Sequence, residues 1–288
     1  MPQIRGNSAL ARAGRVCTPT VRYWMETEVH VYGFSIAANV LLSFFPFLIV
    51  MVSLCKYLFQ WPGAVDAIMF ALNDYFPADM VDFIQRNLRA TVNSRGPMQM
   101  GSILLLFFTA NGIFEPMEVA LNRAWGITQN RSFLKNQLVS MGLIFACGGL
   151  ILASIAVTAA NRQILRQSPL GQSEIESWLT VLFFKAAELP ITILILFLIY
   201  WLLPNRRMPW RDVVPVSIFV GLALEGLKYI NLLTWPYLRM KLEREYGPFI
   251  NSVTIVLWSF LAAMVVLAGA EWAARRRNAA LNAMPDLS

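Results

Sequence analysis

The chain has 288 residues, of which 57% are apolar and 14% are charged, and its mean hydropathy is +0.53. Soluble domains average about 45–50% apolar and about 25% charged residues, so this composition excludes an ordinary water-soluble protein. The net charge of +7 would favour a nucleic-acid partner in a soluble protein, but the basic residues here flank apolar runs, where they orient membrane helices, and no nucleic-acid partner is expected.

The apolar runs predict six transmembrane helices, because a helix that spans the bilayer needs about 20 mostly apolar residues. A basic segment, residues 1–32, precedes them, and residues 276–288 follow as a tail; both are predicted to be cytoplasmic. Charged residues interrupt the fourth and fifth runs, but the other residues of these runs are strongly apolar. The helices are expected at residues 33–56, 97–120, 136–161, 179–203, 212–236 and 247–272, within one transmembrane domain over residues 33–275.

The longest loop, about residues 57–97, joins the first two predicted transmembrane helices and is expected to lie outside the cell. Its apolar residues recur at helical spacing before and after Pro77, which predicts two short amphipathic helices. These would rest on the outer leaflet or cap the bundle, while a solvated connector packed on the helix ends is an equally good interpretation. The acidic residues of this loop, Asp79 among them, are interpreted as solvated helix faces. The predicted fold is all-α: a polytopic membrane protein with six transmembrane helices and short amphipathic helices in the first outer loop.

The positions of lysine and arginine predict the orientation of the chain, since short loops rich in these residues stay in the cytoplasm. With the N-terminus inside, the two densest basic clusters both fall inside. These are Arg206 and Arg207, before the fifth helix, and Arg275, Arg276 and Arg277, after the sixth. Both termini are therefore predicted to be cytoplasmic.

Charged side chains at membrane depth are the best indicators of function, because each costs about 2.5–3.5 kcal/mol at a helix centre. Glu225 lies near the middle of the fifth predicted helix, and Lys228 follows three residues later on the same face. The pair indicates either a polar cavity or ion path, or an internal ion pair that only fixes helix packing; we weigh the two evenly. We expect Glu225→Gln to impair folding less than Lys228→Met, which leaves a carboxylate near mid-membrane.

Two residues of the second predicted helix, Glu115 and Asn111, extend the candidate polar cavity. Glu115 has no lysine at helical spacing in its own segment, so a cation from another helix is expected, and Lys228 is one candidate. A secondary pair, Lys185 and Glu188, lies nearer the outer surface. For this pair we favour a structural role, since Lys185 can extend to the interface, where charges cost little.

The residue pattern argues against an enzyme. The chain has one histidine, His30, and contains no HExxH, GxSxG or glycine-rich phosphate-binding motif. Its three cysteines, Cys17, Cys55 and Cys147, form no CxxC pair. No metal site, disulfide or cofactor is therefore predicted.

Several short motifs in register resemble those of the bacterial YihY/BrkB family of inner-membrane proteins. They are residues 42–46 (LSFFP), residues 120–125 (ALNRAW), Leu203-Pro204 before Trp210-Arg211, and Tyr246-Gly247 with Trp258 and residues 269–271 (GAE). The resemblance covers residues 30–275 and implies a six-helix protein of the bacterial cytoplasmic membrane. Members are often labelled ribonuclease BN or virulence factor BrkB; no activity is securely attached to the family, and transport is the usual suggestion. Asn39 departs from the family pattern, where many relatives carry an apolar or aromatic residue.

The leading hypothesis is a transporter or permease-like protein in which Glu225, Lys228, Glu115 and Asn111 line a polar cavity for a small solute or ion. The alternative is a non-catalytic membrane scaffold or envelope-integrity factor, with its charges in internal pairs. A membrane-bound ribonuclease is a distant third, because no metal site is visible and acids at membrane depth cannot meet RNA. The expected partner is the lipid bilayer; a homo-oligomer is left open, and the solute is not identified.

Overall fold

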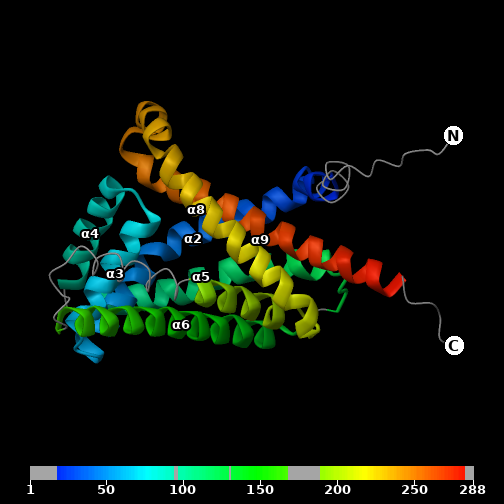
Figure 1. Cartoon of the computed structure of the whole chain (residues 1–288), viewed down its shortest axis with the longest axis horizontal. Coiled ribbons are helices and arrows are strands. Elements are labelled where there is room, and N and C mark those ends of the chain that lie inside the picture. The colour runs from blue at the N-terminus through cyan, green and yellow to red at the C-terminus, as the bar shows by residue number, and fades with distance from the viewer. Residues whose placement is uncertain (1–17, 94–96, 130, 168–188, 283–288) are drawn as a thin grey trace.

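The computed structural model describes residues 18–93, 97–129, 131–167 and 189–282, and within them every regular element is a helix. This confirms the all-α prediction. Figure 1 shows the arrangement. The elements are α2 (Thr27–Ser53), a π-helical turn η1 (Leu54–Leu58), α3 (Pro62–Tyr75), α4 (Ala78–Asn93), α5 (Pro97–Ala124), α6 (Phe133–Gln167), the Leu189–Leu202 helix, α8 (Trp210–Tyr246), a 3-10 turn η2 (Gly247–Phe249) and α9 (Ile250–Asn282).

Three stretches of the described chain are long and apolar enough to cross a bilayer: Glu28–Tyr57, Leu134–Ser154 and Trp210–Ala279. The last contains two helices, because the chain reverses at Gly247, whose φ of +50° suits glycine. The predicted count of six is not confirmed. Residues 179–188 of the fourth predicted helix lie outside the described part of the chain, and its described remainder is the short Leu189–Leu202 helix.

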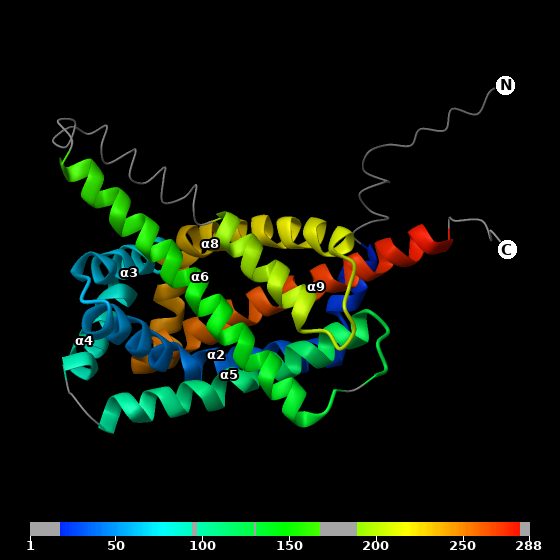
Figure 2. The same cartoon turned by 90° about the horizontal axis from the view of Figure 1, so that it is seen from below.

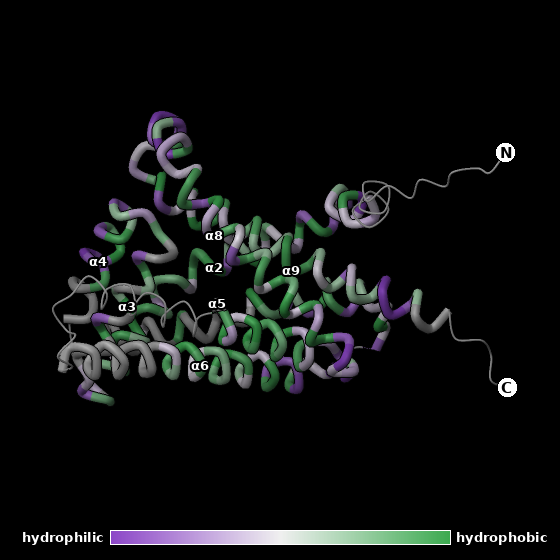
Figure 3. Tube along the Cα trace, viewed as in Figure 1, coloured by the Kyte–Doolittle hydropathy of each residue, from purple (hydrophilic) through white to green (hydrophobic). Residues whose placement is uncertain are grey.

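Helices α8 and α9 form a long antiparallel hairpin (Figures 1 and 2). The 37 residues of α8 extend about 55 Å at about 1.5 Å per residue, well beyond the hydrocarbon core of about 30 Å. Figure 3 shows a polar turn of this hairpin and predominantly apolar helices in the middle of the molecule. The hairpin is therefore expected to extend beyond the membrane surface on at least one side.

The hairpin helix α9 lies at the centre of the structure, packed against α2, α5 and α8. A side chain at Gly269 would collide with Val220 of α8, and its Cβ would lie 2.9 Å from the hydroxyl of Tyr200. Glycine thus permits the close approach of three helices. The Tyr200 hydroxyl donates to the Val266 carbonyl at 2.7 Å, and Trp125 Nε1 donates to the Ala270 carbonyl at 2.8 Å.

The contact between α2 and α5 explains Asn39. Its Nδ2 donates to the Ser35 carbonyl at 2.9 Å, and its amide occupies the space beside Gly112 of α5, where any Cβ would collide with it. The polar side chain therefore fills a gap that glycine leaves between two packed helices.

Helices α3 and α4 occupy the predicted loop and are separated at Pro77. The buried face of α4, which includes Met80, Ile84 and Leu88, packs in one apolar cluster with the last turns of α2. The two predicted short helices are therefore present, and α4 packs on the end of α2 through its apolar face. Asp79 is not simply solvated: its carboxylate accepts a hydrogen bond from Trp235 Nε1 at 3.2 Å and lies 3.5 Å from Arg239 Nε, both on α8.

Candidate functional site

The paired charges of α8 lie at different degrees of burial. The Nζ of Lys228 is 2.8 Å from Oε1 of Glu225, and the side chains are 3% and 26% exposed respectively. A buried ammonium is costly unless it is paired and hydrogen-bonded. The pairing therefore offsets part of the cost of burying Lys228. The side chain of Glu225 remains partly exposed.

A cavity of about 310 Å³ adjoins this pair. Its walls come from α2, α8, α9 and the Leu189–Leu202 helix, together with Phe76 from the connection between α3 and α4. Most lining residues are apolar; the polar ones are Glu225, Lys228, Asn231, Thr192 and Ser259. A mostly apolar, concave wall with a few convergent polar groups is typical of small-molecule sites, which start at about 300 Å³.

Trp258 of α9 also lines this cavity, and its indole nitrogen is buried with no hydrogen-bond acceptor among the described residues. An unsatisfied buried donor costs about 1–3 kcal/mol. Native structures contain few such groups. The cavity wall at Trp258 therefore has a hydrogen-bond donor that no described residue satisfies.

Only some of the site residues predicted from the sequence lie at this cavity. Glu225 and Lys228 lie together at the cavity, whereas Glu115 is exposed on α5 and is not part of the lining. Lys228 forms an ion pair with Glu225 on its own helix, and the candidate pairing with Glu115 is not observed. Asn111 belongs to α5, but its side chain lies outside the described part of the structure, as do Lys185 and Glu188.

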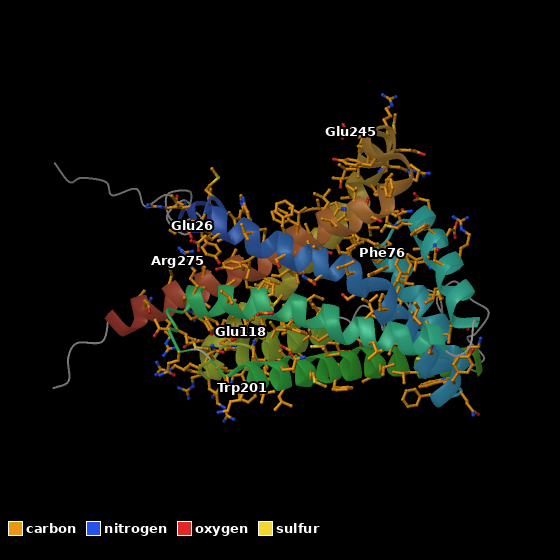
Figure 4. The ribbon with its side chains drawn as sticks, turned by 180° about the vertical axis from the view of Figure 1, so that it is seen from behind. Glu26, Phe76, Glu118, Trp201, Glu245 and Arg275 are labelled. Carbon is orange, nitrogen blue, oxygen red and sulfur yellow. The ribbon has the colours of Figure 1, made fainter. Side chains whose placement is uncertain are left out.

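A second polar cluster, at the end of the molecule where α2 begins and α9 ends, was not predicted as a site. We call this end the arginine-rich end. Glu118 is 6% exposed; its Oε1 lies 3.4 Å from the donor Nδ2 of Asn122. Asn122 Oδ1 in turn accepts the backbone N–H of Asn205 at 2.8 Å. Figure 4 shows Glu118 toward the same end as Arg275 and Trp201, whereas Phe76 lies toward the opposite end.

Arg131 joins this cluster by capping a helix. Its Nη1 donates to the carbonyls of Leu202 at 3.1 Å and Leu203 at 3.3 Å, and its Nη2 donates to the Pro204 carbonyl. A cation is favourable at a helix C-terminus, where the last carbonyls have no partner in the helix. Burial lowers the pKa of Arg131 from its ordinary value, and the nearby carboxylate of Glu118 opposes that shift. In the sequence this role is indicated only by an arginine in a short loop between two apolar helices. The sequence does not show which helix Arg131 caps, because that helix lies about 70 residues further along the chain.

Comparison with known proteins gives a family. Residues 20–286 match the family model described as Virulence factor BrkB. The chain belongs to this family. The resemblance found in its motifs is thus confirmed over almost the whole sequence.

The BrkB relatives are named in two ways. The chain is 28% identical over 240 residues to the "Putative ribonuclease-like protein YfkH" of Bacillus subtilis (strain 168), which covers 80% of this chain and 84% of that protein. It is 27% identical over 208 residues to a UPF0761 membrane protein of Acinetobacter baylyi, covering 69% of this chain and 46% of the relative. It is 24% identical over 264 residues to a UPF0761 membrane protein of Nitrosospira multiformis, covering 88% of this chain and 58% of the relative.

This BrkB chain therefore spans about half the length of these two UPF0761 relatives. No solved structure matches it. The family and the long apolar helices together identify an integral membrane protein. Within the described residues, no group of three or more histidine, cysteine, aspartate or glutamate side chains is placed to hold a metal ion.

Proposed function

We propose that this chain is a permease-like protein of the bacterial cytoplasmic membrane, in which the cavity beside Glu225 and Lys228 admits a small solute or ion. The observation that carries the proposal is the position of the pair: a buried lysine and a half-open carboxylate at the edge of a cavity of about 310 Å³. The arginine-rich end would face the cytoplasm, as the distribution of basic residues favours.

The cavity favours transport over a purely structural role. A buried ion pair adds little net stability, since well-packed apolar residues of similar volume do as well or better. An ion pair that only fixed helix packing would be expected in a filled interior. Here an open volume adjoins it, about ten times the share of one molecule in liquid water, about 30 Å³.

The lining also limits the chemistry of the solute. One cationic and one anionic group lie together in walls that are otherwise mostly apolar. Such walls suit a small zwitterion with an apolar portion, or a dehydrated ion that exchanges places with one member of the pair. Large, highly charged polymers such as RNA do not fit a cavity of this size.

The two alternatives make different demands. A scaffold or envelope-integrity factor would need the helices but not an accessible cavity. A ribonuclease would need a site that meets RNA, and the ribonuclease-like name belongs to the Bacillus subtilis relative. The absence of a three-residue metal cluster from the described residues gives that alternative no structural support.

Solute flux into proteoliposomes tests the proposal. Stopped-flow light scattering would compare small zwitterions, such as glycine and betaine, with sodium and potassium salts. Ala262→Phe would fill the cavity from α9, Glu225→Gln with Lys228→Met would neutralise the pair, and Leu233→Phe on the exposed face of α8 is the matched control. At least one solute should enter faster than into protein-free vesicles. Ala262→Phe and the double variant Glu225→Gln/Lys228→Met should each abolish this faster entry, whereas Leu233→Phe should leave it unchanged. Permeation equal to that of protein-free vesicles for every solute, or unchanged by Ala262→Phe, would contradict the proposal.

A further inference from the structure

A second cavity, of about 380 Å³, opens at the arginine-rich end. Three segments form its walls: residues 125–129 between α5 and α6, Arg206 and Met208 before α8, and the last turns of α9. Among the described residues that line it are two guanidinium groups, those of Arg206 and Arg277, and no carboxylate. The cavity therefore offers paired positive charge without an internal counter-ion in its lining.

The walls of this cavity are held in place by contacts that cross between the three segments. Trp125 Nε1 donates to the Ala270 carbonyl of α9 at 2.8 Å. Asn205 Nδ2 donates to the Gln129 carbonyl at 2.8 Å, and Arg131 binds the carbonyls just before Asn205. A site whose walls are already fixed loses little conformational entropy when a ligand binds.

The surroundings of the cavity concentrate positive charge. Arg207 follows Arg206, Arg211 lies in the first turn of α8, and Arg276 lies in the last turns of α9. The guanidinium of Arg211 lies over the ring of Trp210, and that of Arg276 lies over the ring of Trp272. The nearest acidic partner of Arg277 is Asp212, 4.0 Å away at the outer limit of an ion pair. A surface with this excess of guanidinium groups attracts anions.

The neighbouring α8 surface indicates where the anion comes from. Trp210, 61% exposed at the start of α8, is the kind of residue that lies at the level of lipid headgroups. The next turns expose Ile218, Phe219 and Leu222, a face suited to acyl chains. The arginine-lined cavity thus stands at the headgroup level of a helix that continues into the lipid, rather than in a water-facing domain.

We propose that the cavity between Arg206 and Arg277 binds the phosphate of an anionic phospholipid headgroup. Guanidinium groups bind phosphate oxygens in a bidentate manner, and basic pockets between membrane helices hold headgroups in this way. Thr128, Gln129 and Asn278 supply neutral polar groups, and Met208 and Ala274 give an apolar wall. This lipid site is separate from the cavity at Glu225 and does not depend on transport.

Native mass spectrometry of the full chain, released from detergent with added lipid, tests the proposal. Phosphatidylglycerol and phosphatidylcholine would be compared for the wild type, for Arg206→Ala with Arg277→Ala, and for Lys241→Ala with Arg244→Ala. The last pair removes the same charge from the exposed far end of α8. We expect the wild type and the far-end variant to retain phosphatidylglycerol at least tenfold better than phosphatidylcholine, and the Arg206/Arg277 variant to lose that preference.

Four further arms, one variant and three competitors, keep the test decisive. Arg206 is exposed, so Arg206→Ala alone should fold even if the double variant does not, and it should weaken phosphatidylglycerol binding severalfold. Inorganic phosphate, glycerophosphoglycerol and a short RNA at equal concentration should fail to displace the bound lipid. An unchanged preference in the folded Arg206 variant, an equal loss in the far-end variant, or displacement by inorganic phosphate or RNA would overturn the assignment to a lipid headgroup.

Discussion

The ammonium of Lys228 lies 2.8 Å from the carboxylate of Glu225, yet the lysine side chain is 3% exposed and the glutamate side chain 26% exposed. The cation is thus the more deeply buried member of the pair. The carboxylate is the member with the more exposed side chain. This asymmetry decides how variants of the pair should behave.

We predict that Glu225→Gln destabilises the protein more than Lys228→Met. The first change removes the carboxylate that lies 2.8 Å from a buried ammonium, and removing one partner of a buried pair costs about 3–5 kcal/mol. The second leaves a carboxylate that is already partly exposed. From sequence position alone we expect the opposite, that Lys228→Met is the more harmful change. Sequence position locates both residues near mid-membrane but does not show which of them is more buried. Thermal unfolding in detergent checks the order, and combining both changes should recover part of the loss; a lower midpoint for Lys228→Met would contradict it.

Gly269 should be intolerant of a methyl group. Gly269→Ala would drive Cβ into Val220 and to 2.9 Å from the Tyr200 hydroxyl, and such overpacking costs about 1–3 kcal/mol. Gly226→Ala on α8 is the matched control, because nothing lies within 4 Å of its added Cβ. The melting temperature should fall for the first variant and hold or rise for the second. Equal midpoints would show that the α8–α9 packing is looser than described.

Asp79 should hold α4 against the hairpin. Asp79→Ala removes the acceptor of Trp235 Nε1 and the anion near Arg239, each worth about 1 kcal/mol or less at this exposure. Amide hydrogen exchange over residues 78–93 should therefore accelerate severalfold, and less so for Asp79→Asn, which keeps an acceptor oxygen. Asp82→Ala, on the exposed face of the same helix, should leave exchange unchanged; acceleration as large as that in Asp79→Ala would refute a specific tether.

Arg131→Lys should loosen the end of the Leu189–Leu202 helix although the charge is kept. An ammonium cannot reproduce the fork that binds the carbonyls of Leu202, Leu203 and Pro204. We expect a loss of about 1–2 kcal/mol and faster exchange over residues 200–208. Lys135→Arg, exposed near the start of α6, is the control. Wild-type exchange in Arg131→Lys would mean that charge alone is sufficient.

Sequence patterns predict those parts of the structure that depend on neighbours along the chain. The apolar runs locate α2, α6 and the α8–α9 hairpin, helical spacing locates α3 and α4, and a separation of three residues pairs Glu225 with Lys228. These features follow from helix geometry and from the apolar bilayer, which act locally.

The remaining features depend on residues distant in sequence. The packing of Asn39 against Gly112, the exposure of Glu115 and the binding of Arg131 to the carbonyls after the Leu189–Leu202 helix all require knowledge of which helices are adjacent. A single sequence contains no such information. The same limit explains why the arginine-lined cavity, whose walls come from three separate segments, was not among the predicted sites.

Access of solutes to the cavity at Glu225 can be measured directly by thiol accessibility. In a chain with Cys17, Cys55 and Cys147 replaced, Thr192→Cys and Ser259→Cys would report from two walls of the cavity, Glu245→Cys from the exposed turn of the hairpin, and Leu233→Cys from the exposed apolar face of α8. A membrane-impermeant maleimide would be added outside right-side-out vesicles and, separately, outside inverted vesicles, so that each side of the membrane is probed in turn. We predict labelling at residues 192 and 259 from at least one side, with none at residue 233. Labelling at residue 245 alone would contradict it and favour a non-transporting scaffold.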